Sequence, residues 1–165
     1  MTPQLDAQLQ TKLKQCIELA EQAFSRTFPA PSLSYNVRGK AAGKAYLQLN
    51  QVRLNPTLLA ENPQAFVDEV LPHEVAHLIT HQVYGRVKPH GIEWQTVMSQ
   101  VFGLAPQTTH SFSTQSVQGK TFAYQCQCSE HALSVRRHNR VMRNQTRYNC
   151  ITCKQALTFT GVQLS

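Results

Sequence analysis

The segment His73-Glu74-Val75-Ala76-His77 constrains the fold of this chain more than any other feature of its sequence. Residues four apart lie on one face of an α-helix, so the two imidazoles can bind a single zinc ion. Glu74 follows the first histidine directly, where its carboxylate can hold and deprotonate a water molecule on the metal. The segment therefore predicts a helix and indicates a zinc hydrolase, with a protease as the preferred class.

The residues around this segment predict where its helix begins and ends. Asn62 is a favourable N-cap and Pro63 a favourable first helical residue, and an apolar pattern continues up to Gly85. Pro72 interrupts the pattern, because it has no backbone N–H and its ring clashes with the preceding turn. We therefore expect a short helix over residues 63–70 and a second one that starts at Pro72 or one residue earlier. The alternative is an ordinary helix with two exposed histidines and a solvated glutamate.

A catalytic zinc ion usually has three protein ligands and one open position, so a third ligand must be found. His81 continues the spacing of His73 and His77, but eight residues at about 1.5 Å each place it about 12 Å along the helix from His73. Zinc ligands lie about 2 Å from the metal, so His81 cannot share the ion. The third ligand must come from chain that folds back after Gly85.

Three residues after the expected loop at 85–89 are candidates for this position. His90 is the first choice, because it opens the next helical run. Glu93 is the competitor, since glutamate completes some zinc hydrolase sites, and whichever of the two is not a ligand can support the other from one helical turn away. His110 is a weaker candidate. As oxyanion stabilisers the sequence offers, by position alone, Tyr84, His81 and His110.

Four of the five cysteines form two clusters that indicate a structural zinc site. Cys126 and Cys128 lie about twenty residues before Cys150 and Cys153, as in a zinc ribbon in which two hairpins bind one ion. The second pair has the usual ligand spacing, whereas the first is one residue short, so His131 remains an alternative to one member of that pair. Disulfides are the competing interpretation, but an odd number of cysteines and the lack of an export signal favour metal binding.

Nearly all of the net charge of +7 lies in the last third of the chain. Residues 118–165 contain one acidic side chain, Glu130, and seven basic ones, which are Lys120, Arg136, Arg137, Arg140, Arg143, Arg147 and Lys154. Tyr124, Tyr148 and Phe159 are interleaved with them, so contacts to phosphate and stacking on bases are both available. The segment therefore indicates nucleic-acid binding by its five arginines; the alternative is a solvated basic surface that keeps a small module soluble.

The remainder of the first 117 residues is predicted to be scaffold. Apolar residues at helical spacing indicate an amphipathic helix from residue 5 to about residue 27, in which Cys16 is a core residue. Segments 33–38, 44–48 and 51–55 have the pattern of three short strands, which we expect to form a small antiparallel sheet. The edge of such a sheet beside a zinc-binding helix could receive an extended peptide.

Taken together, these motifs resemble the bacterial SprT family of zinc metalloprotease-like proteins, which is related to the eukaryotic Spartan proteases. The resemblance covers about residues 33–160 and rests on four stretches, Leu54-Asn55-Pro56, Pro72-His73-Glu74-x-x-His77, Pro89-His90-Gly91-x-x-Trp94 and Arg136-Arg137-His138-Asn139-Arg140. It implies His73, His77 and His90 as zinc ligands and Glu74 as the catalytic residue. The relationship to a DNA-dependent protease adds weight to nucleic-acid binding by the basic segment.

We therefore expect an α+β protein with two domains. Residues 1–117 would form a zincin-like metalloprotease core with a long N-terminal helix, a small antiparallel sheet and a zinc-binding helix pair, and residues 118–165 a basic zinc ribbon. One catalytic and one structural zinc ion are the expected cofactors. The ribbon is too short to bury a large core, so its zinc ion should contribute much of its folding free energy.

The expected function is hydrolysis of a peptide bond by zinc-activated water, with Glu74 as general base, in a protein substrate on or near DNA. One alternative is a non-catalytic DNA-binding or regulatory protein that keeps the zinc helix for structure, and another is a hydrolase that cuts a bond other than a peptide. No apolar stretch approaches the roughly 20 residues needed to span a membrane and the polar N-terminus lacks a signal-peptide core, so we expect a cytoplasmic protein without a membrane partner.

Overall fold

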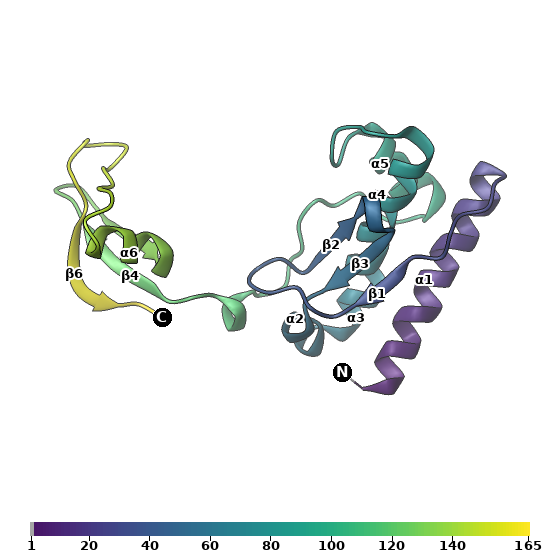
Figure 1. Cartoon of the computed structure of the whole chain (residues 1–165), viewed down its shortest axis with the longest axis horizontal. Coiled ribbons are helices and arrows are strands. Elements are labelled where there is room, and N and C mark those ends of the chain that lie inside the picture. The colour runs from purple at the N-terminus through teal and green to yellow at the C-terminus, as the bar shows by residue number, and fades with distance from the viewer. Residues whose placement is uncertain (1) are drawn as a thin grey trace. The chain divides into compact units, whose positions relative to one another are not determined.

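The computed structural model describes residues 2–165, which form two compact units that divide between Val117 and Gln118. Both units contain helices and short strands, so the predicted α+β class is confirmed (Figure 1). The assignment of a zincin-like domain to the first unit and of a zinc ribbon to the second stays a prediction. None of the helices in residues 2–165 has the length and apolar character needed to cross a membrane.

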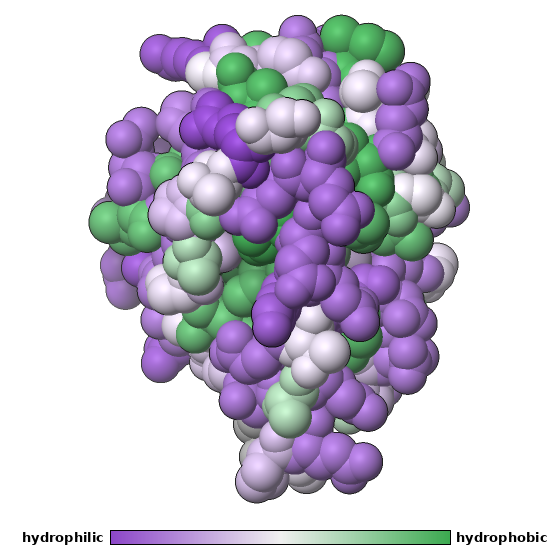
Figure 2. All heavy atoms as spheres, turned by 90° about the vertical axis from the view of Figure 1, so that its right-hand side faces the viewer, coloured by the Kyte–Doolittle hydropathy of each residue, from purple (hydrophilic) through white to green (hydrophobic). Residues whose placement is uncertain are grey.

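Helix α1 (Pro3–Phe24) is the amphipathic helix expected from the apolar spacing. Thr2 caps it, because its side-chain oxygen accepts a hydrogen bond from the Leu5 N–H at 3.2 Å. Its buried face consists of Leu9, Leu13, Cys16 and Ala20. The core position predicted for Cys16 is therefore confirmed. Viewed from the side of α1, the molecular surface is mainly hydrophilic, with hydrophobic side chains in separate patches (Figure 2).

Three short strands form a sheet in the order β1-β3-β2, where β1 is Ser32–Ser34, β2 is Gly43–Tyr46 and β3 is Gln51–Leu54. Strands β2 and β3 are antiparallel, as predicted. Strand β1 differs from the prediction, because it runs parallel to β3 with Leu33 opposite Val52. The chain passes from β1 to the far edge of the sheet as β2 and returns as β3 between them. Strand β2 is therefore an edge strand with one side unpaired within residues 2–165.

Asn55 fixes the junction between β3 and the next helix, α2 (Pro56–Glu61). It is 1% exposed, and its side-chain oxygen accepts hydrogen bonds from the N–H groups of Thr57 and Leu58. Its amide nitrogen donates to the carbonyl of Gly39 at 2.7 Å. This single side chain therefore caps α2 and holds the loop that leads into β2.

Residues 63–84 form one continuous helical stretch instead of two separate helices. The stretch consists of α3 (Pro63–Ala65), a π-helical turn at Phe66–Val70 and α4 (Leu71–Tyr84). Leu71 donates its N–H to the carbonyl of Phe66, five residues back, which widens the turn just before Pro72. A widened turn leaves room for the proline ring, so the chain continues without a break. The predicted start next to Pro72 and the predicted end at Gly85 are both observed.

Helix α4 occupies the centre of the first unit. It contacts α1 as well as strands β2 and β3 (Figure 1). The run predicted after His90 forms α5 (Ile92–Thr96), which continues into a π-helical turn at Val97–Val101. His90 has a φ of 58°, so the chain turns through a left-handed residue just before α5 and comes back toward α4.

The second unit has a three-stranded antiparallel sheet in the order β5-β4-β6. Its elements are β4 (Thr121–Gln125), β5 (Glu130–Ser134), helix α6 (Val135–Met142) and β6 (Thr158–Gln163). Its fully or nearly fully buried side chains are few, namely Ala123, Tyr124, Leu133, His138 and Cys150. His138 stacks on Phe122 with ring centroids 3.7 Å apart, and its Nδ1 lies 3.0 Å from the Tyr124 hydroxyl. The core of this unit is thus as small as the sequence suggested.

Candidate active site and cysteine cluster

Three histidines from two parts of the first unit meet at one point. His73 and His77 lie one turn apart on α4, and His90 is in the loop before α5. Their Nε2 atoms are 3.3 Å (His73–His77), 3.1 Å (His77–His90) and 3.0 Å (His90–His73) apart. Ligand nitrogens about 2.0–2.1 Å from a tetrahedral zinc ion stand about 3.3 Å from one another. The three nitrogens therefore fit one ion.

The orientation and charge state of these rings also suit a metal ion. His73 Nδ1 lies 3.2 Å from the carbonyl of Gln107 and donates to it, which leaves the Nε2 lone pair free. Burial lowers the pKa of His73 to about 3 and that of His77 to about 4, with repulsion from neighbouring histidines adding to the effect. Burial also lowers the pKa of His90. All three rings are therefore neutral near pH 7, the form that binds a metal.

Trp94 supports the three histidines. Its ring centroid lies 4.8 Å from that of His73 and 4.7 Å from that of His90, and its Nε1 donates a hydrogen bond to the His73 carbonyl at 3.3 Å. Sequence reasoning gave Trp94 no role, although its place four residues after His90 was an available signal. The carbonyl of Gln107 was also missed, and a backbone group leaves no signal in the sequence.

Glu74 is buried between α4 and the edge strand β2. Its side chain is 7% exposed, and burial raises its pKa to about 7, although a hydrogen bond from the Ala45 backbone acts in the opposite direction. A Cβ atom at Gly43 would lie 2.9 Å from Glu74 Cγ and 3.1 Å from its Oε1. Glycine at position 43 is therefore what lets the carboxyl group fit beside the strand. A carboxyl group with a pKa near neutral pH can both accept and donate a proton.

The three histidines and Glu74 line one cleft of about 680 Å³. The chain from Ala42 to Leu47, which includes β2, lines the same cleft. Glu93 does not: it is absent from both the cleft lining and the histidine group, and its Oε2 lies near Gly91. The structure thus brings His90, and not Glu93, to the histidine pair, while the ligand role of His90 stays a prediction.

Of the three suggested oxyanion stabilisers, His110 is the one that lines this cleft. Its ring centroid lies 5.6 Å from that of His73, and it stacks on Phe112 at 5.3 Å with an angle of 7° between the planes. The other two suggestions lie elsewhere. His81 lines a different cavity, and Tyr84 is 44% exposed with its ring against α1.

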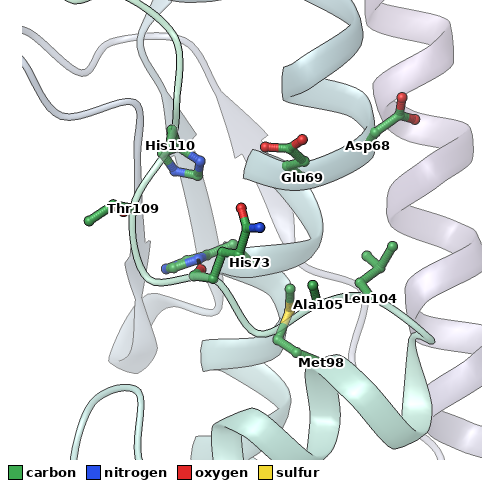
Figure 3. Close-up of a pocket in the computed structure, with 9 residues that line it drawn as sticks. Asp68, Glu69, His73, Met98, Leu104, Ala105, Thr109 and His110 are labelled. Atoms are coloured by element: carbon green, nitrogen blue, oxygen red, sulfur yellow. Dashed lines mark hydrogen bonds between the residues drawn. The ribbon is translucent and has the colours of Figure 1, made fainter.

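His110 also borders a smaller cavity of about 260 Å³ beside His73. Figure 3 shows the Glu69 carboxylate pointing toward His110, whereas that of Asp68 points away. Burial lowers the pKa of His110, and the negative charge of Glu69 partly offsets this effect. The His110 ring thus stacks on Phe112 and borders both the cleft and the smaller cavity.

The four clustered cysteines come together in the second unit. The sulfur atoms of Cys126, Cys128, Cys150 and Cys153 all lie within 4.8 Å of one another. The sulfur atoms are 3.5 Å apart in Cys126–Cys128 and 3.6 Å apart in Cys128–Cys150, close to the ~3.8 Å between sulfurs about 2.3 Å from a tetrahedral zinc ion. His131 Nε2 lies 3.4 Å from Cys126 Sγ. The cluster could hold a metal ion and is compatible with zinc, with His131 at its edge.

The five arginines named as nucleic-acid contacts are all exposed. Arg136 and Arg140 are four residues apart on α6 and so share one face of it, whereas His138 on the same helix is buried. The guanidinium of Arg137 lies over the ring of Tyr148, 5.6 Å from its centroid. Arg147, farther along the chain, lines a cavity of about 540 Å³ together with Phe159.

One aromatic residue suggested for base stacking cannot serve. Tyr124 has no exposed surface, because its ring lies in the core of the second unit against His138 and Phe159. Tyr148 and Phe159 keep part of their surface exposed. Of the aromatic residues suggested, these two remain available for stacking.

The chain is similar to known proteins over most of its length. The model of the SprT-like family matches residues 13–110, which include the three histidines and Glu74 but not the cysteine cluster. Protein SprT of Vibrio parahaemolyticus serotype O3:K6 (strain RIMD 2210633) is 64% identical over 165 residues, with 98% of this chain and 100% of that protein covered. Protein SprT of Vibrio atlanticus (strain LGP32) is 58% identical over 164 residues, with 99% and 98% covered. Protein SprT of Actinobacillus succinogenes (strain ATCC 55618 / DSM 22257 / CCUG 43843 / 130Z) is 56% identical over 153 residues, with 93% and 90% covered.

Proposed function

The chain belongs to the SprT-like family, and from this premise we propose that it is a zincin-like, zinc-dependent metalloprotease with Glu74 as general base. The observation that carries the proposal is the meeting of three Nε2 atoms, 3.0–3.3 Å apart, in one cleft with a buried carboxyl group. Burial of three imidazoles and a carboxyl group side by side is unfavourable unless these groups bind a partner such as a metal ion. A metal-dependent reaction explains this arrangement better than packing does.

Each group in the cleft has a role in this reaction. A zinc ion bound by His73, His77 and His90 would lower the pKa of a water molecule from about 15.7 toward about 7 and polarise the carbonyl of the substrate. Glu74 accepts a proton from the attacking water and later delivers it to the leaving amine. Burial raises the pKa of Glu74 in the metal-free site, and the positive charge of a bound zinc ion would lower it, which favours the carboxylate form that accepts the proton.

The edge strand supports a peptide as the substrate. Strand β2 lines the cleft and has one unpaired side in the part of the chain that the structure describes. An extended peptide can add to such an edge through backbone hydrogen bonds, with side chains in flanking pockets. Since Gly43 at the start of β2 lies against Glu74, a peptide on this strand would have its backbone next to the proposed general base.

His110 is proposed to stabilise the oxyanion, and His110→Ala is therefore expected to lower kcat by about 10²-fold with little change in KM. His110→Gln, which keeps an N–H donor, should retain more of the activity. Steady-state kinetics and zinc content of both variants check this. A rise in KM at constant kcat would mean that His110 only contacts the substrate, and loss of zinc would make it a ligand.

The proposal includes nucleic-acid binding by the second unit. Its exposed arginines, its charge excess and the part-exposed rings of Tyr148 and Phe159 supply the two contacts that single-stranded nucleic acid needs, phosphate pairing and base stacking. Binding to DNA would restrict cleavage to proteins that are bound to DNA, so that other proteins of the cell are not cut.

Arg136→Gln together with Arg140→Gln is expected to weaken DNA binding and to reduce its salt dependence. Each phosphate contact that is lost should lower the slope of log K against log salt by about 0.7–0.9. The matched control replaces Lys12 and Lys14 of α1 by glutamine, which removes the same charge from the first unit. Fluorescence anisotropy of labelled DNA across a salt series measures both. An equal loss in the two variants would point to net charge alone and against a site on α6.

The proposed function is tested by incubating zinc-loaded and zinc-free protein with a DNA-binding protein as substrate, with and without DNA. We expect cleavage products from the zinc-loaded protein in the presence of DNA. Equal cleavage without DNA would contradict the confinement to DNA-bound protein. DNA binding without cleavage under any condition would support the non-catalytic alternative.

A further inference from the structure

The smaller cavity of about 260 Å³ adjoins the proposed active site at His73 and His110 (Figure 3). These two residues line both the cleft and this cavity, so the two spaces share a wall. Farther from the cleft, the cavity is bounded by the helical turn before α4 and by the chain that follows α5. The reaction proposed above gives this space no role.

The His73 ring separates the cavity from the place where a metal ion would bind. Its Nε2 atom lies 3.3 Å from that of His77 and 3.0 Å from that of His90. Its Nδ1 atom donates to the carbonyl of Gln107, a residue that lines the cavity. Because the two nitrogens lie on different edges of the ring, a side chain in the cavity does not compete with a metal ion for Nε2.

Glu69 places a negative charge at this cavity. It lies four residues before His73 on the same helical stretch, so the two side chains project from one face with their Cβ atoms about 5–6 Å apart. The Glu69 side chain is exposed, and its carboxylate points toward His110 (Figure 3). The salt bridge found within residues 2–165 joins Lys14 to Glu18, so no basic side chain of this range neutralises Glu69. Its charge is therefore available to a ligand.

The other polar groups of the lining leave this negative charge uncompensated. No lysine or arginine of residues 2–165 lines the cavity. Burial lowers the pKa of His73 and of His110, so both rings are neutral near pH 7. Asp68 also lines the cavity, but its carboxylate points away and accepts a hydrogen bond from Gln64 at 2.7 Å (Figure 3). The cavity therefore favours a cationic ligand, with Glu69 as its partner.

Apolar side chains supply the second part of the lining, namely Met98, Leu104 and Ala105. Lysine and arginine have long apolar stems that pack on such surfaces while the charged end stays in contact with water. The four-carbon stem of lysine spans about 5 Å, close to the pitch of the helical turn between Glu69 and His73. A basic side chain that enters beside His73 is thus long enough to bring its charge to Glu69.

We propose that this cavity binds a lysine or arginine side chain of the substrate, next to the bond that is cut, with Glu69 as the specificity-determining residue. The proposal rests on the proposed function, because it assumes a peptide in the cleft. A peptide bond held at the three histidines lies beside the wall formed by His73 and His110, and a neighbouring side chain reaches the cavity from there. Proteins use lysine and arginine to neutralise DNA phosphates, so a substrate on DNA carries such residues.

Peptide binding tests the pocket without requiring cleavage. Three libraries of fluorescein-labelled decapeptides carry lysine, norleucine or alanine at one central position, with flanks randomised among uncharged residues. Each is titrated with zinc-loaded Glu74→Gln protein. Norleucine has the stem of lysine without its charge, so we expect lysine to bind about fivefold tighter than norleucine, as for one part-exposed ion pair. Norleucine should bind tighter than alanine because its stem is buried. Adding Glu69→Gln should make lysine and norleucine bind alike.

Asp68→Asn is the matched control, because it removes the same charge from the adjacent residue, whose carboxylate points away from the cavity (Figure 3). This variant should keep the preference for lysine. An equal loss of preference in Asp68→Asn and Glu69→Gln would reduce the effect to net charge and overturn the proposal. Equal binding of lysine and norleucine without either substitution would overturn it directly.

Kinetics with single peptides separates a binding role of Glu69 from an effect through His110. Glu69→Gln should raise KM for a lysine peptide about fivefold and leave the kinetics of the matching norleucine peptide unchanged. An equal fall in kcat for both peptides would make Glu69 a positioning residue for His110 and would overturn the pocket.

Mass spectrometry of cleavage products from the parent protein gives an independent readout. Enrichment of lysine and arginine at one fixed position beside the cut bond is expected. Cleavage without such enrichment would leave the proposed function intact and sink the pocket. A preference for lysine in binding without any cleavage would leave the pocket intact and sink the protease.

Discussion

Glu74→Gln is expected to reduce kcat for peptide cleavage by about 10²–10⁴-fold while zinc content and fold stay unchanged. Glutamine has the shape of glutamate, so it fits the narrow space between α4 and Gly43. Its amide cannot take a proton from water, so the chemical step loses its base. The histidine nitrogens are not altered, and the metal should stay in place. Steady-state kinetics, zinc analysis and circular dichroism of the same preparation provide the three measurements.

The matched control is Glu93→Gln, the same chemical change three residues after His90. Glu93 lines neither the cleft nor the histidine group, so this variant should keep its zinc and most of its activity. Loss of zinc from Glu93→Gln would mean that Glu93 completes the metal site in place of His90. Cleavage by Glu74→Gln at the rate of the parent protein would remove Glu74 from the mechanism.

The helix that carries this chemistry could be predicted in detail because its signals are local. The histidine spacing, Pro72 and Gly85 set its face, its start and its end. The widened turn before Pro72 could not be predicted, since it depends on a hydrogen bond from Leu71 to Phe66 that competes with the regular one.

Features that depend on distant parts of the chain were harder to predict. Alternation of apolar and polar residues identifies a strand but not the strand that pairs with it. The parallel pairing of β1 with β3 therefore had no signal in the sequence. The return of His90 toward α4 depends on one left-handed residue in a loop. The basic residues near Tyr124 in the sequence indicate an exposed ring, whereas the structure buries this ring in the core of the second unit.

Cys150→Ser is expected to remove one zinc ion per chain and to unfold the second unit. Cys150 is 3% exposed and its sulfur lies 3.6 Å from that of Cys128, inside the cluster. Serine is a poor zinc ligand, and the free energy of zinc binding in small zinc modules, about 10–16 kcal/mol at pH 7, is also their folding free energy. Zinc analysis and the dispersion of amide NMR signals from residues 118–165 measure the effect.

The same substitution at Cys16 shows why this loss should be specific. Cys16 is as buried as Cys150, but it lies on α1 in an apolar core, and within residues 2–165 it belongs to neither group of side chains that could hold a metal ion. Cys16→Ser should therefore destabilise the first unit by about 1–3 kcal/mol, because it buries a hydroxyl group, and it should keep both zinc ions.

The variant His131→Asn tests whether His131 is a ligand of the cysteine cluster. Zinc loss equal to that of Cys150→Ser would make His131 a ligand, whereas retention of zinc would leave the four cysteines as the ligand set. A folded second unit in zinc-free Cys150→Ser protein would contradict the metal-dependent fold, because packing around Tyr124 and His138 would then suffice by itself.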